Sequence, residues 1–529
     1  MSAQSSDSTG QQPVLASQKA TAQGLPIAKS AYFPLGYKEA VGQWWSSISP
    51  AAAEHNVISF VPYLQKPPTH TQTGSSPVSP NQSTMAISED LAKAAAPVRT
   101  TSMTDPHGPR SWHSSLIKLS GKDRALNEFS VQRDGEDIQE NLVMLHGYGA
   151  GLGFFYKNFE GLSRVRGWKI YALDMLGMGR SSRPPFKVHA KNQQGKISEA
   201  EDWFIDALEE WRALKKIDKF TLLGHSMGGY MAVAYALKYP GHLNKLILAS
   251  PVGIPEDPYA MQADMPEPGE STMANEFTQD QDAIVNPNGK LESDGDHNSF
   301  LNAKPKSEVV KDSASNAAPR RPLPKWLTYL WDANISPFSI VRWTGPLGPR
   351  FVSGWTSRRF SHLPPAESVA LHHYAYSLFR QRGSGEYALA YILAPGAFAR
   401  SPLIRRINGV GRQNLPPPAS PSQHITTSSW PSKSLTKETG IPVIMMYGEN
   451  DWMDVAGGYA AEQKLKEEKA RALSAATAEE KNRENGSAKV VIIQKAGHHV
   501  YLDGWEQFND VMRKEMEETS KRTVHEKSL

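Results

Sequence analysis

Short apolar runs alternate with amphipathic segments through much of the chain, which is the pattern of a parallel sheet with crossover helices. After Trp112, segments 116–119 and 128–132 predict an antiparallel pair, and LVML at 142–145 predicts a buried strand that feeds a tight HGYGAG loop. We expect further strands at 169–173, 220–223, 245–249, 443–447 and 489–493, and helices at 155–165, 199–217, 227–239, 458–473 and 505–518. The pattern predicts an α/β fold with a mostly parallel eight-stranded sheet and helices on both faces.

The alternation stops after the sixth expected strand and divides the core into residues 106–254 and 439–529. Residues 255–320 are acidic and rich in Pro, Asn, Ser and Gly, so we expect a disordered insert. Residues 321–408 are aromatic and basic, which indicates a helical cap inserted after the sixth strand. A Pro/Ser-rich linker is expected at 409–438.

Residues 1–105 indicate a mostly disordered N-terminal extension, with one aromatic helix at 37–45 that docks on the body. The first forty residues are rich in Ser, Ala and Gln, as in an organelle transit peptide, but Arg99 is the first arginine of the chain. A targeting signal and a plain disordered tail both remain open.

Composition narrows the possible chemistry. The chain has no cysteine, which excludes disulfides, thiolate metal sites and cysteine nucleophiles. Its formal net charge is +4, and no uninterrupted apolar stretch reaches the length of a membrane-spanning helix. We therefore expect any membrane contact to be peripheral.

The strongest motif is LLGHSMGG at 222–229, which contains G-x-S-x-G around Ser226. An apolar strand precedes it and a helix follows, as a nucleophile elbow requires. Glycines on either side of the serine allow the sharp turn, and the N-terminus of the helix favours a developing oxyanion. Ser226 is therefore the candidate nucleophile.

A serine nucleophile needs a general base and an acid that orients the base, and both follow later in the chain in this fold. AGHHVYLD near the C-terminus offers His498 and His499, and we favour His498 as base, with His499 as a packing or hydrogen-bonding neighbour. YGENDWMD offers Asp451 and Asp454, of which we favour Asp451 because it lies three residues beyond the strand-ending glycine. Each aspartate could instead cap a helix.

The oxyanion hole is expected to use the backbone N–H groups of Met227 and of Tyr148 in the HGYG loop. We interpret His146, in the same loop, as structural. The sequence indicates no metal site, no cofactor and no nucleic-acid recognition motif, and it does not identify protein partners.

Taken together, the segments HGYGAGLGFFYKNF, LDMLGMGRSSRP, EEWR, LLGHSMGGYMAVAYALKYP, YGENDWMD and GHHVYLD resemble those of an α/β-hydrolase subfamily. That subfamily comprises cardiolipin-specific deacylases and lysophosphatidic-acid acyltransferase-like lipid enzymes. The resemblance implies an α/β-hydrolase fold, a phospholipid or lysophospholipid substrate and a Ser-His-Asp mechanism. It also implies an H-x-x-x-x-D acyl-transfer element formed by His498 and Asp503, and mitochondrial residence at a membrane, with the cytoplasm or a lipid-droplet surface as alternatives.

The cap adds a physical argument for a lipid, because its aromatic side chains could enter a bilayer interface and its arginines could pair with phosphate. The alternative is that the aromatic side chains pack the cap and the arginines are solvated. Other functions that remain open are a non-lipid esterase or aminopeptidase and a scaffold that regulates a lipase. The head-group candidates are Arg342, Arg350, Arg358, Arg359 and Arg380.

Overall fold

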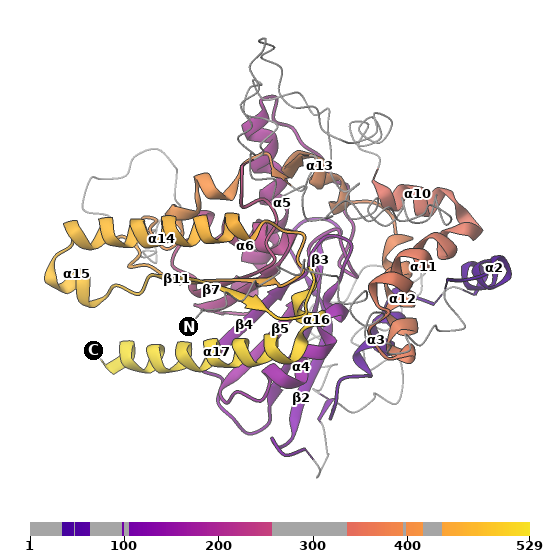
Figure 1. Ribbon diagram of the computed structural model, residues 1–529, viewed down its shortest axis with the longest axis horizontal. Coiled ribbons are helices and arrows are strands. Elements are labelled where there is room, and N and C mark those ends of the chain that lie inside the picture. Colours follow the sequence, from indigo (N-terminus) through magenta and orange to yellow (C-terminus); the bar gives the residue numbers. More distant parts are fainter. Residues whose placement is uncertain are drawn as a thin grey trace, which may run out of the picture.

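A nine-stranded, mostly parallel sheet forms the centre of the computed structural model (Figure 1). The structure describes residues 34–46, 48–63, 98–99, 105–256, 336–394, 398–415 and 436–528. The strand order is β1-β2-β3-β5-β4-β6-β7-β10-β11, and all pairs from β5 to β11 are parallel. The strands are β1 (Val98–Arg99), β2 (Arg110–Lys118), β3 (Ala125–Arg133), β4 (Glu140–Leu145), β5 (Trp168–Leu173), β6 (Phe220–His225), β7 (Leu243–Ala249), β10 (Pro442–Gly448) and β11 (Ser487–Ile493).

The two faces of the sheet carry different helices because alternate residues of each strand point to opposite sides. Val143 and Leu145 of β4 join the apolar cluster under α5, α6 and α14, whereas Leu142 and Met144 join the cluster under α4 and α17. These helices are α4 (Tyr156–Leu162), α5 (Gln193–Leu214), α6 (Met227–Lys238), α14 (Val455–Ala475) and α17 (Trp505–Ser528).

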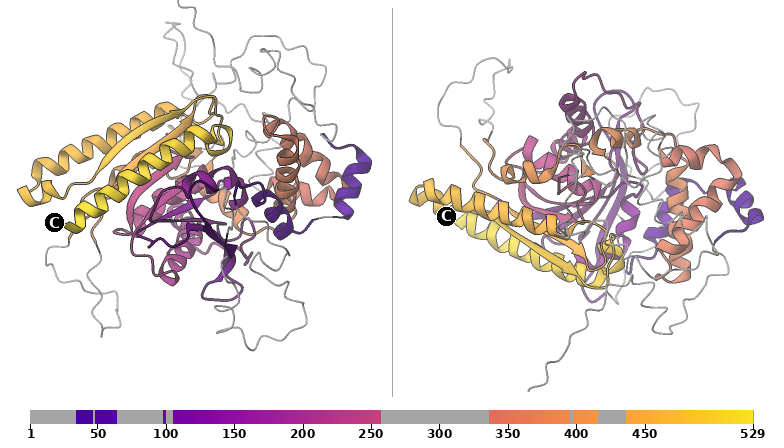
Figure 2. Two further views of the ribbon diagram at one scale, coloured as in Figure 1. Left: turned by 90° about the horizontal axis from the view of Figure 1, so that it is seen from below. Right: turned by 45° about the horizontal axis from the view of Figure 1, so that its top comes forward.

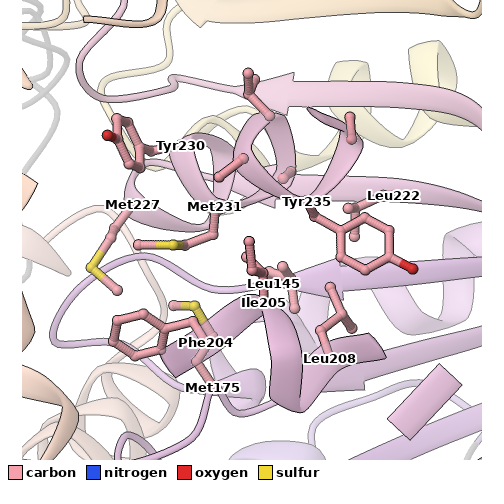
Figure 3. Packing of buried hydrophobic residues seen from close by; sticks show 14 of the residues in the cluster. Leu145, Met175, Phe204, Ile205, Leu208, Leu222, Met227, Tyr230, Met231 and Tyr235 are labelled. Atoms are coloured by element: carbon pink, nitrogen blue, oxygen red, sulfur yellow. The ribbon is translucent and has the colours of Figure 1, made fainter. Parts of the chain in front are cut away.

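Helix α6 packs tightly against α5. Figure 3 shows Met227 and Met231 of α6 gathered with Phe204 of α5 and Met175 from the loop after β5. All four side chains are buried. Met227 is the first residue of α6, so this apolar cluster fixes the position of the helix N-terminus that follows Ser226.

The cap is mostly helical where the structure describes it, and it follows β7, which is the sixth strand when the two-residue β1 is not counted. Its main helices, α10, α11 and α12, lie together at one end of the molecule (Figure 2). The bounds in this region are α10 (Pro337–Trp343), η3 (Gly345–Leu347), α11 (Gly348–Arg359), α12 (Pro365–Phe379), η4 (Gly385–Ala388), α13 (Leu389–Ile392), β8 (Leu393–Ala394), β9 (Phe398–Ala399), η5 (Leu403–Arg405) and η6 (Ile407–Gly409).

The N-terminal extension contributes two helices to the body, α2 (Tyr37–Trp45) and α3 (Pro50–Ile58). The sequence predicted α2 and its docking, but it did not predict α3. Ser49 caps α3 by accepting from the Ala52 N–H, and Pro50 occupies the first turn. A Ser-Pro pair before an alanine-rich run is a recognisable helix start.

The predicted fold class is confirmed, and the differences are local. The sheet has nine strands, not eight, because β1 adds two residues to the edge. The first two predicted strands are longer, since β2 and β3 pair over nine residues each. The short elements η2 (Leu152–Phe155), α15 (Ala478–Asn482) and α16 (Val500–Asp503) were not predicted. Most of the expected acidic insert, the start of the cap and the middle of the expected linker lie outside the described residues.

A buried polar network joins α3 to the core. Glu54 is 1% exposed and accepts from Asn127 Nδ2 at 3.0 Å, while Arg180 forms an ion pair with it. Asn127 also donates to Asp174 at 2.8 Å, and Tyr374 of α12 donates to Glu54 at 3.4 Å. Glu54 therefore connects the N-terminal segment, the core and the cap. Burial raises its pKa to about 7, although Arg180 opposes the shift.

This raised pKa predicts a pH-dependent contribution to stability. The folded carboxyl keeps its proton up to about pH 7, whereas the unfolded one has a pKa of 4.5. The stability that neutral Glu54 contributes is thus fully present below the unfolded pKa and is lost as the pH rises through 7. We expect the Tm of the native protein minus the Tm of Glu54→Gln to decrease as the pH rises from 5 to 8, measured by thermal unfolding in matched buffers. A pH-independent Tm difference would contradict this.

Candidate active site

Ser226 sits at a strained turn between β6 and α6. Its backbone has φ 51° and ψ −116°, a conformation that a residue with a side chain rarely adopts and that costs on the order of 1–3 kcal/mol. Hydrogen bonds hold this turn in place: Ser226 N donates to Ala249 O at 3.0 Å, and its carbonyl accepts from Val252 at 3.3 Å. The neighbouring strand end thus maintains the strain that presents the serine side chain.

Glycines allow the backbone segments around Ser226 to approach closely. A Cβ on Gly224 would lie 2.2 Å from the carbonyl oxygen of Gly228, so the turn from β6 into α6 requires glycine there. A Cβ on Gly147, in the loop after β4, would lie 3.1 Å from Cβ of Ser226 and 2.8 Å from Nδ1 of His225. The HGYG loop therefore lies directly beside Ser226.

The structure brings His498 and Asp451 together. His498 follows β11 and Asp451 follows β10, and His498 Nδ1 lies 3.1 Å from Asp451 Oδ1 with both side chains fully buried. The hydrogen bond from His498 helps to hold the pKa of Asp451 below its usual value against the effect of burial, so the carboxylate is ionised and Nδ1–H donates to it. Among the described residues, Nε2 of His498 has no hydrogen-bond partner. This is the nitrogen that a general base would use.

The backbones of these two loops are tied to each other and to the elbow. Asn450 N donates to Ala496 O at 2.9 Å, which links the loop after β10 to the loop after β11. His225 Nε2 contacts the His498 carbonyl at 3.0 Å, and the two imidazole rings are 4.8 Å apart between centroids. No hydrogen bond between Ser226 Oγ and His498 Nε2 is present in the described part of the chain, and such contacts often tighten only when substrate binds.

His225 is a positioning residue that the sequence reasoning missed. Burial lowers its pKa well below the usual value, so it is neutral, and its Nε2–H donates to the His498 carbonyl. The ring of His499 also packs against His225, at 5.0 Å between ring centroids. His225 is the second residue of G-x-S-x-G, a position that the motif leaves free, so the pattern carried no signal for it.

The two remaining acidic candidates have other partners. Asp454 is the N-cap of α14 and accepts from Ala456 N at 2.9 Å, which is the capping role left open for it. Asp503 accepts from Gly497 N at 3.1 Å and lies 3.4 Å from the ring of His362 in the cap. The interpretation of His498 and Asp503 as an acyl-transfer pair finds no direct contact here, because the His498 ring is directed to Asp451.

The two predicted oxyanion donors belong to α6 and to the loop after β4. The N–H of Met227, at the first position of α6, has no acceptor within the helix. Tyr148 follows Gly147 beside the nucleophile, and its ring stacks on Phe338 of α10 at 5.0 Å, so the cap covers this loop. His146 is fully buried, accepts from Met175 N at 3.1 Å and contacts Gly147 O at 2.7 Å, which are structural contacts. Oxyanion stabilisation stays a prediction.

The five head-group candidates differ in their surroundings. Arg342 donates hydrogen bonds to Glu386 at 2.7 Å and to Ser339 at 2.8 Å, and Arg350 donates to the Leu35 carbonyl at 2.6 Å. These internal contacts argue against both arginines as phosphate ligands. Arg380 is exposed beside the ring of Tyr376, and Arg358 is half-buried.

Arg359 is the head-group candidate whose charge acts on the nucleophile elbow. It ends α11, it is half-buried, and its Nη2 is buried without a hydrogen-bond partner among the described residues. Its positive charge contributes to lowering the pKa of His225. The next residue, Phe360, contacts Phe154 at 5.9 Å, and Phe154 contacts His499 at 6.3 Å, so the end of α11 packs above the base loop.

Within the described residues, no cluster of three or more His, Asp or Glu side chains is arranged to hold a metal ion. The site can act through a serine nucleophile, an imidazole base and a carboxylate that orients the base.

The two aspartates make a matched test of this arrangement. We expect Asp451→Asn to reduce cleavage of a soluble chromogenic acyl ester by about three to four orders of magnitude, because an amide cannot stabilise the imidazolium or hold the correct tautomer. Asp454→Asn keeps a good N-cap residue and should retain activity within about twofold. Equal losses in kcat for the two purified variants would contradict the assignment.

Comparisons with known proteins identify the family of the chain. The model of the alpha/beta hydrolase fold family matches residues 140–504. A probable 1-acylglycerol-3-phosphate O-acyltransferase from Oryza sativa is 30% identical over 390 residues, which cover 72% of this chain and 68% of that protein. A 1-acylglycerol-3-phosphate O-acyltransferase from Arabidopsis thaliana is 30% identical over 391 residues, covering 73% and 68%. A human (lyso)-N-acylphosphatidylethanolamine lipase is 26% identical over 376 residues, covering 70% and 77%.

These matches span both parts of the sheet and the cap between them. The chain belongs to the α/β-hydrolase family, in the group of lipid hydrolases and acyltransferases.

Proposed function

We propose that this protein is a serine acyl hydrolase that cleaves an acyl ester of a phospholipid or lysophospholipid through an acyl-enzyme. The observation that carries the proposal is the buried contact between His498 and Asp451. The His498 carbonyl is also hydrogen-bonded to His225, the residue before the strained Ser226. Ser226, His498 and Asp451 follow three different strands, and the proposal gives them the roles of nucleophile, base and orienting acid.

The proposed reaction has two steps. His498 Nε2 takes the proton of Ser226 Oγ as the oxygen attacks the ester carbonyl, and Asp451 stabilises the imidazolium that forms. The N–H groups of Met227 and Tyr148 stabilise the oxyanion, the imidazolium protonates the departing lysolipid hydroxyl, and an acyl-Ser226 ester remains. Water, deprotonated by His498, then releases the fatty acid and restores the serine.

A lipid substrate is supported by the names of the relatives and by the cap. The relatives from rice, Arabidopsis and human act, by name, on acylglycerol phosphate or on N-acylphosphatidylethanolamine. In this chain, Phe338 stacks on Tyr148 and on Phe379, at 5.0 and 4.5 Å, so aromatic side chains of the cap cover the proposed oxyanion loop. An apolar cover and a nearby arginine suit an acyl ester with a phosphate head group.

Acyl transfer is the second candidate, favoured by the acyltransferase names of the rice and Arabidopsis relatives. Both reactions share the acyl-enzyme and differ in whether water or a lysolipid hydroxyl receives the acyl group. Asp503 accepts a hydrogen bond from Gly497 N and lies beside the ring of His362. We expect it to support the loop that carries His498 under either reaction.

Lipid profiling tests the proposal. We expect purified native protein to release free fatty acid from mixed phospholipids that include cardiolipin and N-acylated phosphatidylethanolamine, and Ser226→Ala to release none above background, because the nucleophile is lost. The products are measured by mass spectrometry, with and without added lysophosphatidic acid. Acyl chains moved to the lysolipid with no free fatty acid would favour the transferase, whereas equal product from both proteins would refute the assignment of Ser226.

Arg359 allows a test of head-group recognition. We expect Arg359→Gln to lower kcat/KM for a phosphate-bearing lysolipid about tenfold to a hundredfold, because the bidentate guanidinium–phosphate pair is lost. The same variant should change kcat/KM for a neutral monoacylglycerol less than threefold. Arg380→Gln, on the exposed end of α12, is the matched control. Equal losses on both substrates would show that Arg359 only supports the fold.

A further inference from the structure

Helix α2 presents an apolar stripe to the outside of the molecule. Tyr37, Val41, Trp44 and Trp45 lie at helical spacing on one side of it and are 65%, 46%, 39% and 82% exposed. Ala40 is the buried residue of the helix. An amphipathic helix of a soluble protein normally turns its apolar face to the core, so this orientation calls for another contact.

The adjoining cap continues the same kind of surface. Ile340, Trp343, Leu347 and Phe351, spaced by three or four residues across α10, η3 and α11, are 39%, 70%, 39% and 52% exposed. Helix α2 packs against η3 and α11, and the three helices lie side by side at the end of the molecule opposite α15 (Figures 1 and 2). Eight of the fifteen exposed large hydrophobic side chains that the structure describes thus lie on one small group of elements.

We call the eight exposed side chains on α2, α10, η3 and α11 the aromatic platform. Helix α2, which carries four of them, is attached to the cap by several contacts. Leu35 N donates to Ser353 Oγ at 3.1 Å, and Arg350 donates to the Leu35 carbonyl while its guanidinium lies 4.3 Å from the ring centroid of Tyr37. Gln43 Oε1 accepts a hydrogen bond from His372 Nε2 of α12 at 3.0 Å. The inner side of α2 is therefore fixed to the cap while its apolar side stays exposed.

The charge around the platform is positive. Residues 336–382 contain six arginines and one acidic residue. Exposed tryptophan and tyrosine side chains, which partition to the boundary between head groups and acyl chains, combined with arginines fit the surface of a bilayer with anionic lipid. Among the described residues, no helix is long and apolar enough to cross a bilayer.

We propose that the aromatic platform docks this protein on the surface of an anionic phospholipid bilayer. Trp45 and Trp343 enter the interfacial layer, and the net positive charge of residues 336–382 attracts the anionic head groups. Phe338, at the start of α10, covers the loop beside Ser226, so the docked surface belongs to the same cap that covers the catalytic site. The docking rests on the exposed surface itself and does not require Ser226 to be the nucleophile.

Flotation of the full-length protein with vesicles tests the docking. The experiment uses Ser226→Ala protein, to avoid turnover, and vesicles of phosphatidylcholine with or without phosphatidylglycerol. We expect the vesicles with anionic lipid to bind the protein. Adding Trp45→Ser and Trp343→Ser to this protein should weaken binding about tenfold or more, since each change removes an aromatic side chain that would insert into the bilayer interface. Tryptophan fluorescence should shift to the blue on binding and lose most of this shift in the variant.

The control changes two exposed large hydrophobic side chains outside the platform, Tyr459→Ser on α14 and Val524→Ser on α17, which are 52% and 61% exposed. It should bind vesicles as the unchanged protein does. In protein that keeps Ser226, Trp45→Ser together with Trp343→Ser should leave the rate of cleavage of a soluble short-chain ester within twofold of the native rate. This measurement separates docking from chemistry. Undiminished vesicle binding by the platform variant would overturn the proposal. So would dimerisation through the platform without vesicle binding, seen by sedimentation velocity.

Discussion

The strained backbone of Ser226 is the constraint on which the site depends. A serine at φ 51° is stable there only because its neighbours hold it, through hydrogen bonds to Ala249 and Val252 and through glycines that allow close backbone approach. Such strain costs on the order of 1–3 kcal/mol, which the surrounding sheet and helix must offset. In return, the side chain leaves the plane of the sheet at the N-terminus of α6, where N–H groups without helical partners converge.

Around this turn, three loops supply groups that only the sheet order brings together. β10 and β11 pair in parallel, so the loops at their carboxyl ends meet, and the Asn450–Ala496 hydrogen bond joins them. His225 then connects the base loop to the elbow through the His498 carbonyl. His225 is neutral in this buried position, because a protonated ring would have to lose its hydration beside a second imidazole.

The cap and the N-terminal helices extend the core in a different way. Glu54, Arg180 and Tyr374 form a buried polar junction between α3, the core and α12, while Gln43 and Leu35 attach α2 to the outer side of the cap. The boundary between cap and core is thus buried and holds a polar network, whereas the outer end of the cap is aromatic and exposed. If that end meets lipid, the cap is both the cover of the site and the part of the protein closest to its substrate.

The sequence alone determined the class of fold and the proposed nucleophile, because apolar periodicity and G-x-S-x-G express local geometry: strand, turn and helix follow one another within a few residues. It also favoured Asp451 over Asp454, because of its spacing from the strand-ending glycine, and His498 over His499, because His498 follows Ala496-Gly497 and begins the H-x-x-x-x-D pattern. Only the tertiary structure decided that Asp454 caps a helix, that Asp503 contacts Gly497 and His362, and that Arg342 and Arg350 are bound within the protein. The same holds for His225, Glu54 and the outward face of α2. Their roles depend on partners that are distant in the sequence, and the pattern of residues along one chain does not specify which distant partner a polar or aromatic side chain will meet.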